Sequence, residues 1–288
     1  MAFPALSRAL PLRTGALLSA ALLAVGCNSA PAPAGDSTAA APRPNHSATA
    51  PHGMVVSASR IASQAGRDVL RAGGNAVDAA IATGFALAVT YPTAGNIGGG
   101  GFMVIRQPDG RATTIEFREM APRASAPAMF IDSTGQYSAH VQHGTLKAVG
   151  VPGTVAGFAL AHDKYGKADW KTLVDPAVRL ASDGFDVPAG LARSLSRAAE
   201  KFKPYPASTA AYSKDGRPYA AGERLRLPDL ARTLTLIRDQ GRDGFYTGET
   251  ARLIADEMRR GGGLITEDDL ARYVAKERAP IRGTYRGY

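Results

Sequence analysis

The sequence predicts a mixed α/β (α+β) domain that follows an export segment, and three observations support this prediction. Hydrophobic residues make up 45 % of the 288 residues and charged residues 20 %, a balance typical of a globular protein with a buried core. A β-hairpin pattern lies between residues 102 and 118, and helical patterns dominate from residue 153 onward. The first 51 residues differ in composition and are expected to lie outside the domain.

Residues 1–26 resemble a signal peptide. Arg8 and Arg13 give a charged start, and the apolar run that follows is too short to span a bilayer as a mature helix. The run ends in Ala-Val-Gly-Cys, which resembles a bacterial lipobox, although leucine is more usual at its first position. We therefore expect lipidation of Cys27 and an exported, lipid-anchored chain in the periplasm or cell envelope. Ordinary signal-peptidase cleavage is the alternative.

Residues 27–51 are expected to form a flexible, lipid-anchored linker. They are rich in Ala, Pro, Ser and Thr, and such a segment cannot bury enough apolar surface to offset the entropy lost on ordering. The formal net charge of the chain is +9, but its basic residues are scattered and form no stripe with interleaved aromatics. This pattern argues against nucleic acid as a partner and against membrane contact other than through the lipid anchor.

The domain is expected to begin near residue 52. The apolar run at residues 54–56 predicts a short buried strand. Ser59 is placed to cap a first helix that ends at residues 73–74, where two glycines stop it. Asn75 is placed to cap a second helix, which is apolar on most faces and ends before Pro92. These two helices are therefore predicted to contribute to the core.

A glycine-rich segment, Gly-Asn-Ile-Gly-Gly-Gly-Gly, occupies residues 95–101. It lacks the Gly-Lys-Ser/Thr of a phosphate-binding loop, and it lacks the spacing and following helix of a dinucleotide fingerprint. The segment instead predicts a tight junction that another backbone or a ligand can approach closely.

A hairpin is predicted next, with strands at residues 102–105 and 113–118 around a turn at 108–110. Alternation places Ile115 and Phe117 on one face of the return strand, and Glu116 and Arg118 on the other. Helices are predicted at residues 154–165, 170–181, 188–202, 228–240 and 248–260, followed by one that Thr266 and Asp269 open with a capping box. Residues 281–288 are predicted to begin a strand.

Residue types and spacing alone reveal no catalytic constellation. The sequence contains no Gly-x-Ser-x-Gly elbow and no His-Glu-x-x-His pattern. His140 and His143 are three residues apart but have no carboxylate or cysteine partner close in sequence, which indicates a solvated loop rather than a metal site. We expect no cofactor and no metal.

Seven segments, taken in order, resemble the γ-glutamyltransferase (γ-glutamyltranspeptidase, glutathione hydrolase) family. They lie at residues 73–80, 95–102, 117–122, 151–157, 176–185, 262–270 and 280–288. Each segment is short, but their common order makes the resemblance specific. It covers the chain from about residue 52 to its last residue.

The resemblance implies an N-terminal-nucleophile hydrolase with an αββα sandwich, made as a precursor that cuts itself into a large and a small subunit. A threonine at the start of the small subunit is then the nucleophile, and its own α-amine is the base. It transfers the γ-glutamyl group of glutathione, or of another γ-glutamyl donor, to water or to an amino-acid or peptide acceptor. Residues 52–288 would form part of the large subunit.

In the family the nucleophile lies in a Thr-Thr-His segment, whereas here the pair Thr113-Thr114 is followed by Ile115. We therefore expect the nucleophile to lie beyond Tyr288, in a missing small subunit. On this expectation the sandwich is incomplete because its C-terminal half is missing, these residues contain no catalytic group, and the fragment alone is inactive.

One substrate-binding residue carries over from the resemblance. Arg118 would bind the α-carboxylate of the donor, because a guanidinium offers two parallel N–H groups to a carboxylate. Glu119 is a possible orienting residue, and the glycine-rich segment is expected to pack against the active-site sheet. The alternative for Arg118 is an ordinary strand-end ion pair with Glu116 or Glu119. Two other functions remain open: a lipid-anchored, non-catalytic module that binds small amino-acid-like solutes, and a family member that acts on another acyl donor.

Overall fold

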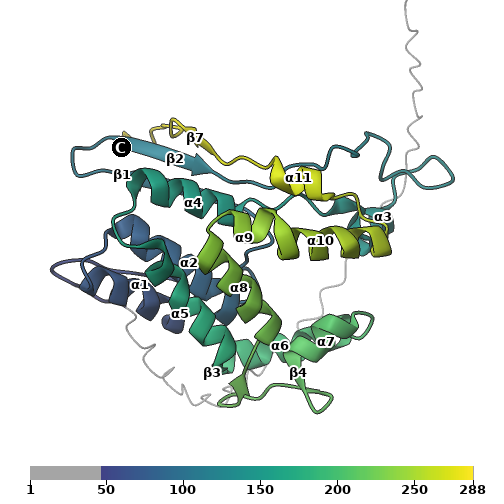
Figure 1. Cartoon of the computed structure of the whole chain (residues 1–288), viewed down its shortest axis with the longest axis horizontal. Coiled ribbons are helices and arrows are strands. Elements are labelled where there is room, and N and C mark those ends of the chain that lie inside the picture. The colour runs from purple at the N-terminus through teal and green to yellow at the C-terminus, as the bar shows by residue number, and fades with distance from the viewer. Residues whose placement is uncertain (1–46, 288) are drawn as a thin grey trace, which may run out of the picture. The chain divides into compact units, whose positions relative to one another are not determined.

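A computed structural model describes residues 47–287 of the chain (Figure 1). The predicted signal peptide at 1–26, Cys27 and most of the linker at 27–51 lie outside the described residues. From Thr49 onward the chain forms one structural unit. No helix within the described part of the chain combines the length and the apolar character needed to span a bilayer.

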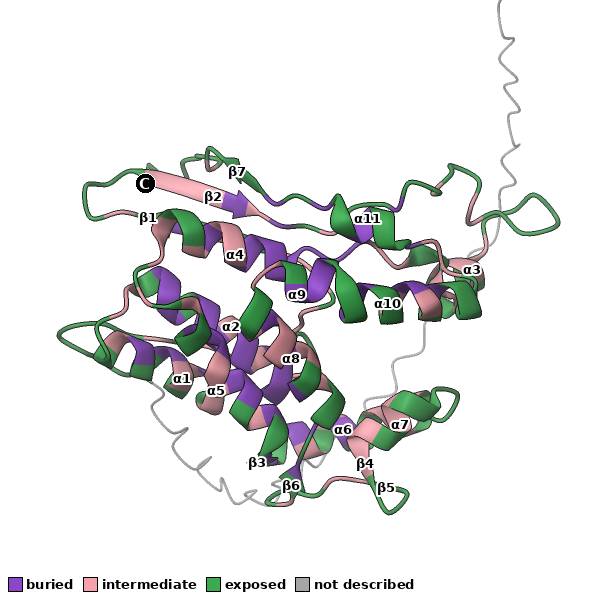
Figure 2. Cartoon of the chain, in the orientation of Figure 1, coloured by how far each residue is buried: buried purple, intermediate pink, exposed green. Residues whose placement is uncertain are grey.

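The first two helices form as their caps predict. Helix α1 (Arg60–Arg71) begins where the Ser59 side chain accepts a hydrogen bond from the Ala62 N–H at 3.3 Å. Helix α2 (Ala76–Thr90) begins with a capping box formed by Asn75 and Asp78. Most of α2 is buried, as expected for a helix that is apolar on most faces. Figure 2 shows this burial continuing onto the neighbouring helices α5 and α8.

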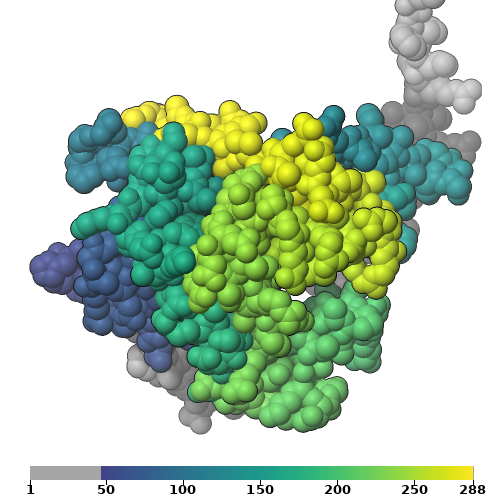
Figure 3. All heavy atoms as spheres, viewed as in Figure 1, coloured from purple at the N-terminus to yellow at the C-terminus, as the bar shows by residue number. Residues whose placement is uncertain are grey.

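A three-stranded antiparallel sheet lies beside this helical layer, in the order β1 (Phe102–Arg106), β2 (Ala112–Glu116) and β7 (Lys276–Arg278). Ile115 faces Glu277 across the β2–β7 pair. Ile115 and Phe117 are buried on the inner side, where the Phe117 ring meets the Phe158 ring of α4 (Thr154–Tyr165) edge to face at 5.7 Å. Figure 3 shows the C-terminal part of the chain, in yellow, lying against the hairpin.

The remaining helices complete the core and its periphery. Those predicted near 170–181, 188–202, 228–240 and 248–260, and the capped one after Thr266, all form. They are α5 (Trp170–Ser182), α6 (Ala189–Phe202), α8 (Pro228–Gln240), α10 (Gly248–Gly261) and α11 (Glu267–Ala271). Nine short elements were not predicted, of which five are α3 (Ala139–Gly144), a 3₁₀ turn at Leu146–Ala148, α7 (Pro206–Tyr212), α9 (Asp243–Tyr246) and β7. Two small ladders also form, pairing β3 (Phe185–Asp186) with β6 (Arg224–Leu225) and β4 (Ser213–Lys214) with β5 (Arg217–Pro218).

Three local predictions were wrong. Residues 54–56 form no strand, and Val56 is 81 % exposed, because an apolar run does not by itself supply a hydrogen-bonded neighbour. Residues 281–287 are also irregular, since the strand in this region lies earlier, at β7. His140 and His143 are exposed as expected, but they lie on α3, which Ser138 caps, rather than in a loop.

Candidate functional site

Arg118 and Glu119 lie between two points of backbone pairing. Just before them, the Phe117 N–H donates to the Gly101 carbonyl at 2.9 Å, and the Gly101 N–H donates to the Phe117 carbonyl at 3.2 Å. Just after them, Met120 pairs with Val151 through hydrogen bonds of 3.2 and 2.7 Å. The backbone that carries the two charged side chains is therefore held on both sides.

The glycine-rich segment lies directly against this backbone. A Cβ at Gly100 would lie 2.4 Å from the Phe117 carbonyl oxygen and 2.8 Å from the Glu119 nitrogen, so only glycine fits there without a shift. The Asn96 side chain holds the loop, because its Oδ1 accepts from the Gly99 N–H at 2.9 Å and from the Thr154 hydroxyl at 2.7 Å. The segment therefore packs closely against the backbone of residues 117–119.

The guanidinium of Arg118 keeps one edge free. Its Nε lies 3.1 Å from Oε2 of Glu119, whereas Glu116 pairs with Arg278 instead. Among residues 47–287, Glu119 is the ion-pair partner of Arg118, neither Nη1 nor Nη2 of Arg118 makes a hydrogen bond, and the side chain is 69 % exposed. The terminal N–H groups of this exposed guanidinium are therefore available to a carboxylate ligand.

Arg118 and Glu119 line a hollow of about 470 Å³, a volume in the range of small-molecule sites. Lys147 is a second cation at this hollow, and Met129 and Phe130 supply apolar wall. Ser125 also lines it, and its buried hydroxyl has no hydrogen-bond partner within the described chain. The hollow can therefore hold a small anionic molecule with an apolar part. Sequence reasoning missed Lys147 because no local pattern links it to Arg118.

Tyr273 is another residue of this region that the sequence did not reveal. Its hydroxyl donates a hydrogen bond of 2.8 Å to the backbone carbonyl of Arg118, 155 residues away. The Tyr273 side chain is buried. Burial, and then the charges of Glu116 and Glu119, raise the pKa of Tyr273 to about 12, so the hydroxyl remains a donor at neutral pH.

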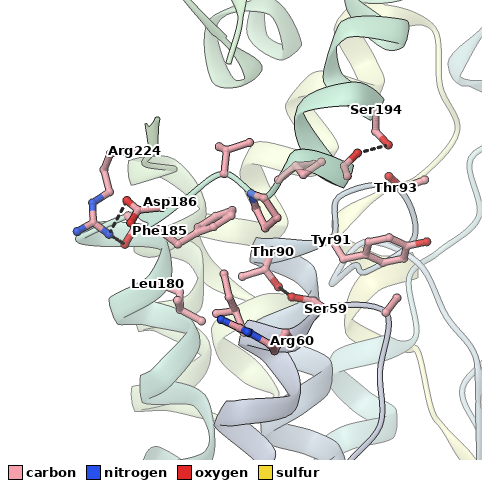
Figure 4. Close-up of a pocket in the computed structure, with 17 residues that line it drawn as sticks. Ser59, Arg60, Thr90, Tyr91, Thr93, Leu180, Phe185, Asp186, Ser194 and Arg224 are labelled. Carbon is pink, nitrogen blue, oxygen red and sulfur yellow. Dashed lines mark hydrogen bonds and ion pairs between the residues drawn. The ribbon is translucent and has the colours of Figure 1, made fainter. Parts of the chain in front are cut away.

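A larger hollow of about 760 Å³ lies elsewhere, and Figure 4 shows its lining. Two pairs of its polar side chains are directed at one another. The Thr90 hydroxyl donates to the Ser59 hydroxyl at 2.8 Å, and the guanidinium of Arg224 lies 3.6 Å from the carboxylate of Asp186 (Figure 4). This hollow has the larger volume, but the other contains Arg118, the arginine that the family resemblance assigns to the donor carboxylate, so the Arg118 hollow is the better candidate site.

The described residues contain no cluster of three or more His, Cys, Asp or Glu side chains that could hold a metal ion. Among residues 48–287, no serine or threonine hydroxyl is hydrogen-bonded to a histidine ring or a lysine ammonium group. The geometry at Arg118 suits the binding of a small carboxylate.

The profile of the gamma-glutamyltranspeptidase family matches residues 62–288. The chain belongs to the gamma-glutamyltranspeptidase family. Over 244 residues it is 49 % identical to the glutathione hydrolase proenzyme of Escherichia coli (strain K12). The matched region covers 84 % of this chain and 42 % of that protein. It is 48 % identical to the glutathione hydrolase proenzyme of Pseudomonas sp. (strain A14), over 83 % of this chain and 42 % of that protein. The chain thus spans about two fifths of the length of these relatives.

Solved structures agree with this gamma-glutamyltranspeptidase assignment. The crystal structure of Helicobacter pylori gamma-glutamyltranspeptidase aligns with a TM-score of 0.81 at 42 % identity, over 84 % of this chain and 69 % of that chain. The prediction of an N-terminal-nucleophile hydrolase fold is confirmed for the part of the fold that this chain covers.

Three of the segments that resemble the gamma-glutamyltranspeptidase family meet at Arg118. The segment at 117–122 carries the arginine, the segment at 95–102 packs against it, and the segment at 151–157 pairs with it through Val151. The segments at 95–102 and 151–157 also contact each other, because the Gly153 N–H donates a hydrogen bond of 2.7 Å to the Gly99 carbonyl. Three of the seven family-like segments are therefore in contact at this site.

Proposed function

We propose that this chain is the donor-binding part of an enzyme that transfers the γ-glutamyl group of glutathione, or of a related donor, to water or to an amino acid. The observation that carries the proposal is the free Nη1/Nη2 edge of Arg118 at the 470 Å³ hollow. The similarity to glutathione hydrolase proenzymes supports it.

In this proposal Arg118 binds the α-carboxylate of the donor through two parallel N–H···O bonds. Glu119 holds the other side of the guanidinium and so limits its rotation. The glycine-rich segment allows the backbone of residues 117–119 to lie directly against Gly100, and Arg118 lines the hollow. Binding in one orientation places the γ-amide at a fixed distance from the arginine.

The nucleophile is proposed to be a threonine at the start of a small subunit encoded beyond Tyr288. Its hydroxyl attacks the γ-carbonyl carbon while its α-amine takes the proton, and the amide C–N bond breaks as the leaving amine receives that proton. Water or an amino-acid amine then attacks the γ-glutamyl ester, which releases the product and restores the threonine. The complete enzyme, meaning this chain together with the remainder of the large subunit and the small subunit, is therefore needed for turnover.

The outer face of the sheet is the proposed contact surface for that small subunit. Phe102 and Val104 share this face and are 59 % and 69 % exposed, which is unusual for two apolar side chains on one strand. Residues 52–288 expressed alone should therefore aggregate, whereas the complete enzyme should be soluble. A monodisperse, cooperatively melting preparation of residues 52–288 would contradict this assignment.

Release of p-nitroaniline from γ-glutamyl-p-nitroanilide tests the proposed function. We expect turnover by the complete enzyme and none by the purified 288-residue chain. Turnover by the 288-residue chain would contradict the assignment of the nucleophile to the small subunit. A complete, folded enzyme that releases no p-nitroaniline would contradict the proposed function.

We also propose that the chain is exported and anchored to the membrane through lipid on Cys27. The charged start, the apolar run and the lipobox-like end of residues 1–27 support this. The protein should sediment with the membrane fraction, and Cys27→Ala should release it. An alanine variant that still sediments with membranes would contradict the anchor.

A further inference from the structure

The carbonyl of Arg118 lies where the sheet pairing changes partner. Phe117 still pairs with Gly101 of the hairpin, but Met120 pairs with Val151 of a different segment. Between these two points the Arg118 carbonyl has no backbone partner, and the Tyr273 hydroxyl takes that place at 2.8 Å. A phenol thus supplies the hydrogen bond that a neighbouring strand would otherwise supply.

The ring and the backbone of Tyr273 are each held by a neighbouring residue. It stacks on the ring of Tyr246, with centroids 5.7 Å apart and planes inclined by 13°. The Tyr273 carbonyl accepts a hydrogen bond of 2.9 Å from Nη2 of Arg242, whose guanidinium lies 4.7 Å from the centroid of the Tyr246 ring. Because the ring cannot move freely, its hydroxyl defines the position of the Arg118 carbonyl.

Space for this contact is kept open by a glycine. A Cβ at Gly153 would lie 2.2 Å from the Tyr273 hydroxyl oxygen and 2.0 Å from the Phe117 carbonyl oxygen. The Gly153 backbone is itself fixed by its hydrogen bond to Gly99. The contact between Tyr273 and Arg118 is therefore accommodated by the surrounding backbone.

We propose that Tyr273 is a positioning residue, which orients the Arg118 guanidinium toward the donor carboxylate by holding the Arg118 carbonyl. This inference rests on the proposed function, because it assigns a role within the same site. Loss of the hydroxyl would leave the Arg118 carbonyl unpaired and allow the peptide between Arg118 and Glu119 to rotate. A bidentate ion pair needs both guanidinium nitrogens at a defined place, so the donor would then bind less tightly.

The test compares Tyr273→Phe with Tyr246→Phe in the complete enzyme. The pair is closely matched, because both side chains are buried and each hydroxyl donates a hydrogen bond of 2.8 Å to a backbone carbonyl. The Tyr246 hydroxyl donates to the carbonyl of Pro152. Only Tyr273 contacts Arg118. Kinetics with γ-glutamyl-p-nitroanilide should show a KM about tenfold higher for Tyr273→Phe, equivalent to about 1.4 kcal/mol, with kcat changed less than twofold. For Tyr246→Phe the KM should remain within twofold of the wild-type value.

A second comparison uses the Arg118→Ala background, in which Tyr273→Phe should change KM less than twofold because the side chain that it positions is gone. Three results would each overturn the inference: an unchanged KM in Tyr273→Phe, an equal rise in Tyr246→Phe, or an equal rise when Arg118 is already alanine. A wild-type enzyme that is inactive, or one that does not depend on Arg118, would instead overturn the proposed function.

A third variant keeps the test decisive if Tyr273→Phe does not fold. Replacing Tyr273 by 4-aminophenylalanine retains the ring and one N–H donor. Its KM should stay within about threefold of the wild-type value, and a tenfold rise despite the retained donor would overturn the inference.

Discussion

Arg118 and Glu119 form an ion pair between adjacent residues, with 3.1 Å between Nε and Oε2. The pair engages one edge of the guanidinium and leaves the two terminal nitrogens free. Exposed pairs of this kind contribute at most about 1 kcal/mol to folding. The importance of Glu119 is therefore expected to lie in orienting Arg118 rather than in stability.

Glu119→Gln should accordingly raise the donor KM about two- to fivefold, with little change in melting temperature. The reason is that a neutral amide holds the guanidinium less firmly than a carboxylate does. Glu116→Gln is the matched control, because Glu116 pairs with Arg278 and not with Arg118. Steady-state kinetics of both variants check the prediction, and equal KM values for the two would contradict it.

Asp78 is predicted to be a structural carboxylate. It is fully buried and accepts hydrogen bonds from the backbone N–H groups of Asn75 (2.8 Å), Lys167 (3.0 Å) and Ala168 (3.1 Å). Asp78→Ala would leave these donors unpaired and should destabilise the complete enzyme by about 3 kcal/mol. Asp229→Ala, at an exposed position in the first turn of α8, is the control. Urea denaturation that shows equal midpoints for both variants would refute this role.

Gly153 is predicted to tolerate no side chain. Gly153→Ala would force its new methyl group against the Phe117 carbonyl and the Tyr273 hydroxyl, at 2.0 and 2.2 Å, so the backbone around Arg118 must shift. We expect a loss of stability of about 2 kcal/mol or more and a higher donor KM. Gly190→Ala, in the first turn of α6, is the control because no atom lies nearer than 4.0 Å to the added carbon. A melting temperature of Gly153→Ala equal to that of Gly190→Ala would show the prediction to be wrong.

The contribution of Glu277 should depend on pH. Hydrogen bonds from Lys164, and then from Tyr165 and Thr113, lower the pKa of Glu277 from its ordinary value of 4.5 to about 2. A carboxylate whose pKa falls on folding stabilises the protein above its unfolded pKa and loses that effect as pH decreases toward the folded pKa. The difference in melting temperature between wild type and Glu277→Gln should therefore be constant above about pH 5 and shrink between about pH 4.5 and 2. A difference that is unchanged at pH 2.5 would contradict this.

The sequence predicted the helices, caps and hairpin whose formation depends on residues close together in the chain. Helices α4 and α8 begin and end where predicted, because apolar periodicity and glycine stops are visible within each segment. Caps at Ser59, Asn75 and Thr266 form for the same reason. The hairpin followed from alternation and a turn signal.

Features that depend on distant partners were not predictable. Strand β7 is only three residues long, and it is held by contacts of Glu277 with Thr113, Lys164 and Tyr165, which no local pattern announces. The hydrogen bond from Tyr273 to Arg118 joins residues 155 positions apart. Arg118 itself was identified through the family resemblance, since an arginine near the end of a strand is not informative alone.

The central claim is that Arg118 recognises the α-carboxylate of a γ-glutamyl donor, and a matched pair of substrates tests it most directly. γ-Glutamyl-p-nitroanilide carries this carboxylate, whereas 4-aminobutyryl-p-nitroanilide lacks it and keeps the amine. With the complete enzyme, Arg118→Ala should lower kcat/KM for the first substrate at least thirtyfold, which corresponds to about 2 kcal/mol, and for the second less than twofold. Arg118→Lys should fall between wild type and alanine on the first substrate, because lysine supplies a point charge without the fork. An Arg118→Ala enzyme with unchanged kcat/KM for the γ-glutamyl substrate, or with equal losses on both substrates, would contradict the claim.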